Sequence, residues 1–472
     1  MPKRRTKIVC TIGPASQSPQ VMRGLIQAGM NVARLNFSHG SHQDHARTVS
    51  TLRSVSAELG TRVAILQDLS GPKMRIGTIA GDEAELKARQ RFTLTSRDIP
   101  GDGRAVSVNT PELIESLEPD DRILLADGEL ELRVRKVAGG EAECEVVAGG
   151  LLRSKKGITA PGVKLRRTVP TEKDLTDLEF GIAQEVDWVA QSFVRTPEEL
   201  QRLKSIIRDR KADIPVIVKL EKREAAERFR EIIDAADGVM VARGDLGLEV
   251  GLKEIPYLQK QIIRYATQVG KPDITATQML ESMIANPRPT RAEATDVANA
   301  VFDGTDAVML SGETAIGKYP VEACRTMAEI AAAAEEHIDY VEQFRTNPLI
   351  PGADIQEAIG HAASDTALRI GASMIICCTR SGKTAATVAK YRPHARIAVA
   401  SPFEKTLLRT ILFWGTRPIK MELAHDTDRM IDEAKQAVLK AGLAQKGEKV
   451  VIVAGIPIDE PGTTNMIKAD VL

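Results

Sequence analysis

The chain has 472 residues, too many for one hydrophobic core, and its length predicts two to four domains. Lysine plus arginine balance aspartate plus glutamate at 64 each and aromatic residues make up only 3%, so neither an electrostatic footprint nor stacking platforms for nucleic acid are indicated. The five cysteines lack metal-binding spacing and no apolar run suits a signal peptide or a membrane span, so we expect a cytoplasmic protein without nucleic-acid or membrane partners.

Apolar strands alternate with amphipathic helices at the beginning of the chain. We expect strands over 7–12, 31–35 and 62–67, with helices from Gln20 and from Gln43 between them. This alternation is typical of a parallel sheet covered by helices.

Short strands and turns replace the alternation between residues 70 and 170. Asp127-Gly128 stands between the apolar stretches 123–125 and 130–132, which is typical of a β-hairpin. We therefore predict a β-rich lid domain over 70–170, inserted into the alternating domain.

The alternation resumes at Thr171, which with Asp174 has the spacing of a helix capping box. A helix is expected over 223–235, and five more strands are predicted over 187–191, 215–220, 238–242, 272–276 and 306–310. Three strands before the insertion and five after it predict an α/β (β/α)₈ TIM barrel, built from 1–69 and 171–346.

A second alternating region follows a predicted linker at 347–352. Residues 354–472 predict a smaller α/β domain with an open, mostly parallel sheet. Its strands are expected over 373–378, 396–400, 419–421 and 449–454, and helices are expected up to Ile370, from Thr384 and over 427–441.

Chemically capable side chains stand where the predicted barrel strands end. Lys219 and Glu221 are two residues apart, so they project to the same side. Because the active site of such barrels lies at the carboxyl ends of the strands, we expect these side chains to meet. They are Arg34, Asn36, Asp68, Ser192, Lys219, Glu221, Arg243, Asp245, Thr277, Ser311 and Glu313.

Several sequence blocks closely resemble the signatures of pyruvate kinase, in the right order over almost the whole chain. The resemblance implies phosphoryl transfer from phosphoenolpyruvate to ADP, giving pyruvate and ATP in the last step of glycolysis. It also implies a regulatory C-terminal domain and, typically, a homotetramer. The blocks are Ala33-Arg-Leu-Asn-Phe-Ser-His-Gly40, Gly71-Pro72 with Arg75, Lys156-Gly157, Lys219-Leu-Glu221, Val241-Ala-Arg-Gly-Asp-Leu-Gly247, Ala276-Thr-Gln-Met-Leu-Glu-Ser-Met283, Pro287-Arg-Pro-Thr-Arg-Ala-Glu293 and Met309-Leu-Ser-Gly-Glu-Thr314.

Phosphoryl transfer requires positioning and charge neutralisation, and the residues suit both tasks. Glu221 and Asp245 are oxygen ligands suited to Mg²⁺, with Mn²⁺ as an alternative, and the metal would also take substrate oxygens. Lys219 is expected to stabilise the transferring phosphoryl group, as in the family. Gly244 and Asp245 would hold the substrate carboxylate through backbone N–H groups, together with Thr277.

The remaining roles concern phosphate binding and proton delivery. Arg34 and Arg75 would bind phosphate oxygens, while Asn36, His39, Arg75 and Lys156 would serve the nucleotide. The enolate must finally be protonated, either by Thr277 or by a water held near Ser311 and Glu313, and the sequence leaves both open.

The monovalent-cation region departs from the commonest family pattern. Family members bind K⁺ through residues that correspond to Asn36, Ser38 and Asp68, plus a threonine that is Leu69 here. A glutamate of that pattern is replaced by Lys73, which is also the residue found in the K⁺-independent branch. A tethered ammonium has the charge of K⁺, so we expect K⁺ not to be required.

A loop in the C-terminal domain is the candidate effector site. It lies between a strand and a helix, and the family binds a sugar-phosphate effector there. Its residues are Thr379, Arg380, Ser381, Gly382, Lys383 and Thr384. Alternative functions are a phosphosugar-sensing binding protein and an enolate-forming lyase; the intact set of strand-end residues argues against the first, and the lid residues Arg75 and Lys156 against the second. Asp273, where the family usually has an apolar residue, is unexplained and is expected to weaken its strand or shift Thr277.

Overall fold

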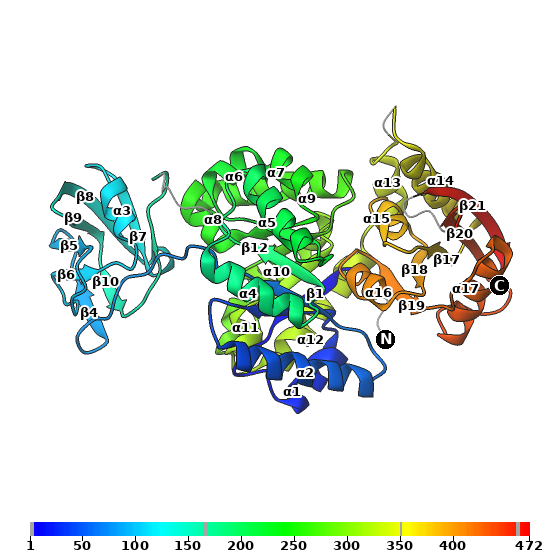
Figure 1. Ribbon diagram of the computed structural model, residues 1–472, viewed down its shortest axis with the longest axis horizontal. Coiled ribbons are helices and arrows are strands. Elements are labelled where there is room, and N and C mark those ends of the chain that lie inside the picture. Colours follow the sequence, from blue (N-terminus) through cyan, green and yellow to red (C-terminus); the bar gives the residue numbers. More distant parts are fainter. Residues whose placement is uncertain (1–3, 164–168, 350–351, 459–462) are drawn as a thin grey trace.

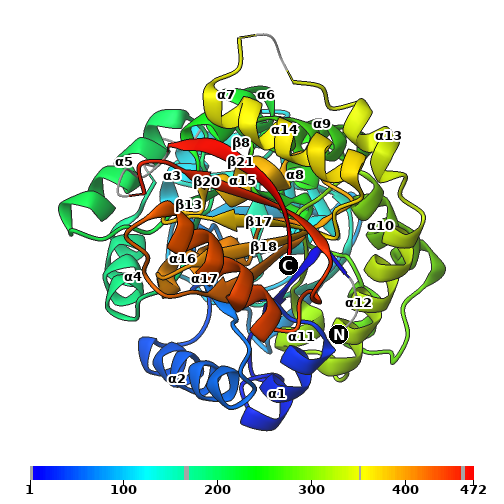
Figure 2. The same cartoon turned by 90° about the vertical axis from the view of Figure 1, so that its right-hand side faces the viewer.

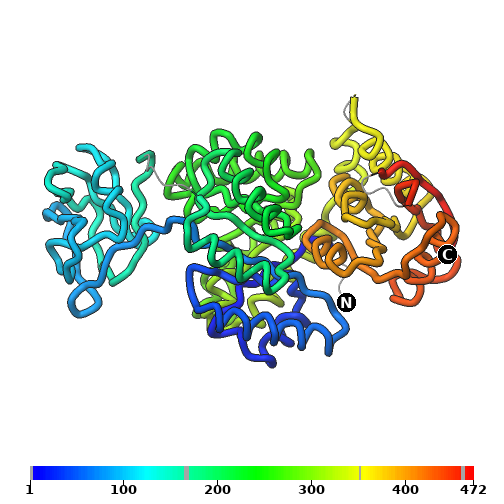
Figure 3. Tube along the Cα trace, viewed as in Figure 1, coloured from blue at the N-terminus to red at the C-terminus, as the bar shows by residue number. Residues whose placement is uncertain are grey.

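The computed structural model describes residues 4–163, 169–349, 352–458 and 463–472, and it arranges them as three bodies in a row (Figure 1). A closed barrel lies in the centre, a β-rich body at one end and an α/β body at the other. The tube in Figure 3 shows the chain leaving the barrel for the β-rich body and returning to it. The predicted architecture is therefore confirmed, although the exact boundaries 1–69, 70–170, 171–346 and 354–472 stay a prediction.

The described residues form a barrel of eight parallel strands, as the sequence predicted. Adjacent strands pair in the order β1, β16, β15, β14, β13, β12, β3, β2. Their bounds are β1 (Lys7–Thr11), β2 (Val32–Asn36), β3 (Ala64–Asp68), β12 (Trp188–Gln191), β13 (Val216–Leu220), β14 (Gly238–Ala242), β15 (Asp273–Ala276) and β16 (Ala307–Leu310). Each lies within two residues of its predicted range.

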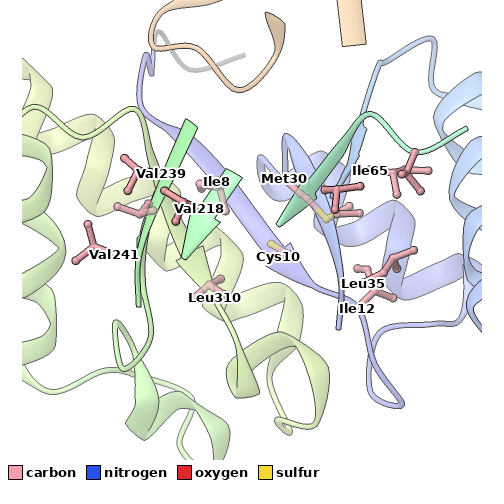
Figure 4. Close-up of a cluster of buried hydrophobic side chains, with 14 of the residues drawn as sticks. Ile8, Cys10, Ile12, Met30, Leu35, Ile65, Val218, Val239, Val241 and Leu310 are labelled. Carbon is pink, nitrogen blue, oxygen red and sulfur yellow. The ribbon is translucent and has the colours of Figure 1, made fainter. Parts of the chain in front are cut away.

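Alternate strand residues face opposite sides of the barrel wall. Ile8, Cys10 and Leu310 belong to the apolar layer between the strands and the surrounding helices (Figure 4). Those helices include α1 (Pro19–Ala28), α2 (His42–Glu58), α4 (Glu172–Ala183), α5 (Pro197–Asp209), α9 (Ile255–Gln268), α10 (Arg291–Phe302) and α12 (Pro320–Glu336). The barrel interior is a second cluster, which Ile411 and Leu412 of the C-terminal body join.

The prediction of one continuous helix over 223–235 is wrong. The segment forms two helices, α6 (Arg223–Glu227) and α7 (Phe229–Ala235), because Arg228 has φ −114° and ψ 25°, outside the helical region. The break leaves α6 in contact with α8 (Arg243–Val250), whereas α7 packs on α5 and α9. The predicted capping box is confirmed: Thr171 accepts from the Asp174 N–H and Asp174 from the Thr171 N–H.

The β-rich body contains the predicted hairpin. Strands β7 and β8 are antiparallel, and a turn over Ala126–Gly128 connects them, with Asp127 at φ 56°. The main sheet has the order β11, β7, β8, β9, β5, β6. The elements of this body are β4 (Glu83–Leu86), β5 (Arg91–Thr95), β6 (Ala105–Ser107), α3 (Pro111–Ser116), β7 (Arg122–Leu125), β8 (Leu130–Ala138), β9 (Glu141–Ala148), β10 (Gly150–Arg153) and β11 (Ile158–Thr159).

The C-terminal body covers the amino end of the barrel and faces the viewer in Figure 2. Its sheet is mostly parallel, as predicted, but the sequence missed an antiparallel edge strand, β21 (Thr464–Val471). The predicted strand 419–421 is β19 (Thr416–Lys420). The other elements are α13 (Tyr340–Arg345), α14 (Ile355–Ile370), β17 (Met374–Cys378), α15 (Lys383–Ala389), β18 (Arg396–Ser401), α16 (Glu404–Thr410), α17 (Thr427–Lys440) and β20 (Lys449–Gly455). Within the described ranges, no helix has the length and apolarity that crossing a membrane requires.

Candidate active site

A cavity lies where the carboxyl ends of β13 and β14 face the β-rich body. The predicted metal ligands Glu221 and Asp245 line it, and Lys73 lines the same cavity from the beginning of the inserted segment. Asp127, at the hairpin turn of the β-rich body, lines it from the opposite side. Two of the predicted strand-end side chains, Glu221 and Asp245, therefore meet at this cavity, at the end of the barrel where the architecture predicts a site.

Four buried charges form a chain at the strand ends. Arg34 Nη2 lies 2.6 Å from Asp68 Oδ2, and Lys219 Nζ lies 3.2 Å from Asp68 Oδ1. Lys219 Nζ also lies 2.8 Å from Glu221 Oε1. Cations and carboxylates therefore alternate from the end of β2 through β3 to the end of β13. Each of these four buried charges has at least one counterion.

The neighbours of Lys219 decide its protonation state. Burial alone would lower the pKa of Lys219, but Asp68 and Glu221 outweigh burial and raise it. Burial likewise opposes the ionisation of Asp68, yet Lys219 and Arg34 lower the pKa of this carboxyl. Lys219 is thus a permanent cation, suited to hold negative charge and unsuited to abstract a proton.

Glu221 and Asp245 fit a divalent cation. Burial raises the pKa of Glu221, and the nearby Asp245 adds to this effect against the opposing charge of Lys219. A metal ion between the two carboxylates would relieve their repulsion. Residues 4–163, 169–349, 352–458 and 463–472 contain no group of three metal-ligating His, Cys, Asp or Glu side chains, so substrate oxygens would have to complete the coordination.

Thr277 has an unusual backbone. Thr277 and Gln278 both have left-handed φ angles, 69° and 53°, and a β-branched residue rarely adopts this conformation. Arg243 holds the turn because its Nη2 donates to the Thr277 carbonyl at 2.7 Å and its Nε to the Ala276 carbonyl at 3.2 Å. The strain is thus compensated by a buried guanidinium.

The Gly244 N–H was expected to be free for a substrate carboxylate. In the structure it donates to Thr277 Oγ1 at 2.8 Å, so a carboxylate would have to share or displace this bond. Thr277 Oγ1 in turn donates to the Ala276 carbonyl at 2.6 Å. The amide and the hydroxyl are therefore brought together, as predicted, but they bind each other.

Ser311 lies at the end of β16. Buried Glu313 accepts the Ser311 N–H at 2.7 Å and the Leu280 N–H at 3.0 Å, so it ties this strand end to the loop after Thr277. The Ser311 hydroxyl is buried and finds no hydrogen-bond partner within the described chain, which leaves it for a substrate or a water. Thr277 and a water near Ser311 both remain as proton donors.

The predicted nucleotide residues gather only in part. The pKa of His39 is lowered by burial and then by Arg75, Lys73 and Arg34, so these three cations surround it. Lys156 is exposed on the β-rich body, just before β11.

The residues predicted to form the monovalent-cation site are also brought together only in part. The Asn36 side-chain oxygen accepts the Ser38 N–H at 3.1 Å. Leu69 is buried in the outer apolar layer of the barrel, and the cations that contact Asp68 are Arg34 and Lys219. Lys73 lines the active-site cavity together with Glu221 and Asp245.

The predicted effector loop borders a separate cavity of about 620 Å³. Gly382 has φ 92° and its N–H donates to Thr379 Oγ1 at 2.9 Å, which closes the loop before α15. Thr384 is hydrogen-bonded to Thr464 of β21 at 2.7 Å. The cavity is lined by Thr379, Arg380, Ser381, Lys383 and Thr384 together with apolar residues that include Met421, Leu423 and Met430.

Sequence reasoning assigned no role to three residues that shape the active site. The Ser192 hydroxyl donates to the Leu69 carbonyl at 2.7 Å and lies 2.7 Å from Lys219 Nζ. The Phe193 N–H donates to Glu221 Oε2 at 2.7 Å. Asp174 accepts the Gly71 N–H at 2.9 Å, where the chain enters the β-rich body. Only Ser192 carried a signal, namely its place after a strand.

Comparisons with known proteins agree with this geometry. A family model described as "Pyruvate kinase, barrel domain" matches residues 3–324, and one described as "Pyruvate kinase, alpha/beta domain" matches residues 357–469. Pyruvate kinase of Staphylococcus aureus strain USA300 is 43% identical over 467 residues, which cover 98% of this chain and 80% of that protein. The crystal structure of a pyruvate kinase from Cryptosporidium parvum superposes with a TM-score of 0.93 at 34% identity, covering 99% of this chain and 96% of that one.

Proposed function

This chain belongs to the pyruvate kinase family, and from that premise we propose which of its residues carry the reaction and which cation the reaction does without. The enzyme transfers the phosphoryl group of phosphoenolpyruvate to ADP, giving pyruvate and ATP in the last step of glycolysis. The family uses Mg²⁺, which in this chain would be held by Glu221 and Asp245 and would neutralise phosphate charge.

Lys219 stabilises the phosphoryl group during transfer. Its permanent positive charge and its place between Asp68 and Glu221 support this role. Arg34 binds phosphate oxygens from the neighbouring strand β2, and Thr277 with Gly244 orients the substrate carboxylate. His39 and Arg75 accompany the nucleotide phosphates, with Asn36 and Lys156 completing that side.

Catalysis proceeds without K⁺. The observation that supports this proposal is the position of Lys73, a residue that lines the active-site cavity with Glu221 and Asp245, while Leu69 is buried in the apolar core. The ammonium of Lys73 thereby takes the place of a bound K⁺, and the Leu69 side chain offers no oxygen that could bind K⁺. The test is the initial rate of ATP formation during a KCl titration at constant ionic strength, which is expected to be flat.

A phosphorylated effector binds the loop from Thr379 to Thr384. Support comes from the adjacent cavity and from two cations at its edge, Arg380 and Lys383. Lys383 is exposed and its backbone N–H donates to the Ser381 hydroxyl at 3.5 Å, so a phosphate bound at this turn could contact both residues. The substrate saturation curve measured with and without sugar phosphates tests this assignment.

The enzyme acts as a cytoplasmic homotetramer. Large apolar side chains are exposed on two bodies, with Leu252 at 78% and Tyr257 at 63% on the barrel and Ile355 at 71% on the C-terminal body. Surfaces of this kind are typical of subunit contacts. Multi-angle light scattering of the purified chain measures the assembly, and a monomer would contradict it.

A further inference from the structure

Asp273 is completely buried at the amino end of β15, under the C-terminal body. The Thr305 hydroxyl donates to Asp273 Oδ1, and the Asp306 N–H approaches Oδ2 at 3.3 Å. The Asp273 N–H donates to Asp306 Oδ2, also at 3.3 Å. The carboxyl is therefore hydrogen-bonded and β15 is paired with β14 in the barrel, while the expected weakening of the strand stays a prediction.

Asp306 joins this group to the C-terminal body. Arg392 donates from Nη1 to Asp306 Oδ1 at 3.0 Å and from Nη2 to Oδ2 at 3.1 Å. The Trp414 N–H donates to the same Oδ1 at 2.6 Å. Asp273, Asp306 and Arg392, which we call the interdomain latch, are 0%, 3% and 3% exposed.

The charges of the latch do not balance if both carboxyls ionise. Arg392 is the cation that faces them from the C-terminal body, and no other charged side chain stands on β15 itself. Lys7 of β1 is the next nearest cation; burial lowers its pKa and its Nζ donates to the Thr416 carbonyl. Beyond Lys7 lie Arg4, Arg417 and Glu335.

Geometry favours one proton on the pair. Each carboxyl is bonded to the backbone N–H of the other residue, so the two buried carboxyl groups lie close together and face one guanidinium, that of Arg392. Burial raises the pKa of Asp273 and the charge of Asp306 raises it further, against the opposing effects of Thr305 and Arg392. One carboxylate then remains for one guanidinium.

The latch lies at the ends of α15, β15 and β16. The opposite end of α15 is in the effector loop, and those of β15 and β16 are at the active site. Arg392 follows α15, which begins in the effector loop at Lys383. Asp273 begins β15, which leads to Thr277, and Asp306 precedes β16, which leads to Ser311. A displacement of the latch therefore shifts strands that carry catalytic residues.

We propose that Asp273 and Asp306 share a proton that holds the C-terminal body on the barrel, and that loss of this proton loosens β15 and β16 and weakens phosphoenolpyruvate binding. The direction of the pH effect follows from linkage. A carboxyl whose pKa is raised in the folded protein keeps its proton there when the unfolded chain has lost it, so the folded state becomes less stable as pH rises. The inference rests on the kinase reaction alone and needs no effector.

Infrared spectroscopy tests the proton directly. In ²H₂O at neutral pH, the full-length protein is expected to show the carbonyl band of a protonated carboxyl, and Asp273→Asn should lose it. Asp187→Asn serves as the control, since burial also raises the pKa of Asp187, to about 7, and this variant should keep the band of Asp273. A wild-type spectrum without a band assignable to Asp273 would overturn the proposal.

The phosphoenolpyruvate half-saturation concentration tests the consequence. In the wild type it is expected to rise about fivefold with alkaline pH, whereas Asp273→Asn, which is neutral at every pH, should hold it constant. Asp273→Val provides the same comparison with an apolar strand residue if the asparagine variant does not fold. The same pH profile in the wild type and the variants would refute the coupling even if the band is present.

Discussion

Lys219 Nζ lies 2.8 Å from Glu221 Oε1, so the residue assigned to phosphoryl stabilisation is paired with a residue assigned to the metal. Lys219 lies in β13 and Glu221 directly follows this strand, two positions further on, and both are almost completely buried. A divalent cation that binds Glu221 would release Lys219 toward the substrate phosphate, because the carboxylate cannot serve both cations equally. In the proposed mechanism, the ion pair would therefore hold the ammonium in place until substrate and metal bind.

Replacement of Lys219 is the first test of this relationship. Lys219→Ala is expected to lower kcat by about 10³-fold with a much smaller change in KM, because the charge acts mainly in the transition state. Lys222→Ala, which removes the cation paired with Glu249 in the same cavity, is the matched control. A change confined to KM in Lys219→Ala would refute the assigned role.

Replacement of Glu221 separates metal binding from catalysis. Glu221→Gln removes one carboxylate of the proposed pair, so the Mg²⁺ concentration for half-maximal rate should rise by about tenfold or more. Glu249→Gln is the control, since Glu249 lines the same cavity but pairs with Lys222. An unchanged Mg²⁺ requirement in Glu221→Gln would exclude this residue as a ligand.

The stability of the fold should depend on pH through Asp187. Burial raises the pKa of this carboxyl to about 7 from 3.8, and its partner is the Ile65 N–H at 2.7 Å. Between these values the folded protein keeps a proton that the unfolded chain has released, so stability falls as pH rises, on the order of 1.4 kcal/mol per pH unit. Thermal unfolding should show a smaller decline from about pH 4 to about pH 7 in Asp187→Asn, and parallel curves would contradict the assignment.

The effector loop has a local test. Sugar phosphates and nucleoside monophosphates are titrated into the enzyme, and one of them is expected to lower the half-saturation concentration of phosphoenolpyruvate by about fivefold or more. Lys383→Ala should abolish this shift, whereas Lys446→Ala, an exposed lysine of the same body outside the cavity, should preserve it. If Lys383→Ala responds like the wild type, the loop binds no effector phosphate.

The barrel was readable from sequence because each strand is a short, mostly apolar run that ends in a polar residue or is directly followed by one. Lys219 and Glu221 could be placed together because residues two apart on a strand share a side. The pairing of Lys219 with Asp68 was not predicted, since it joins strands far apart in the chain. The antiparallel strand β21 was missed because its alternating polar residues resemble an exposed loop as much as an edge strand.

Local signals also failed where a tertiary contact decides the conformation. Nothing in the sequence near Arg228 breaks a helix, yet Phe229 turns inward to pack on Tyr265 and the helix divides. The left-handed backbone of Thr277 is contrary to its own preference and depends on Arg243, the first residue of α8. Such features follow from contacts that form only after the barrel closes.

The independence from K⁺ is the central claim, and one paired rate measurement tests it most directly. The wild type, Lys73→Glu and the double variant Leu69→Thr with Lys73→Glu are assayed in Mg²⁺ buffer whose only other cation is tetramethylammonium, and again after KCl is added. We predict that the wild type is fully active in both buffers and that both variants become active only with KCl, since the fixed cation has been removed. Near-zero activity of the wild type in tetramethylammonium, restored by KCl, would contradict the claim.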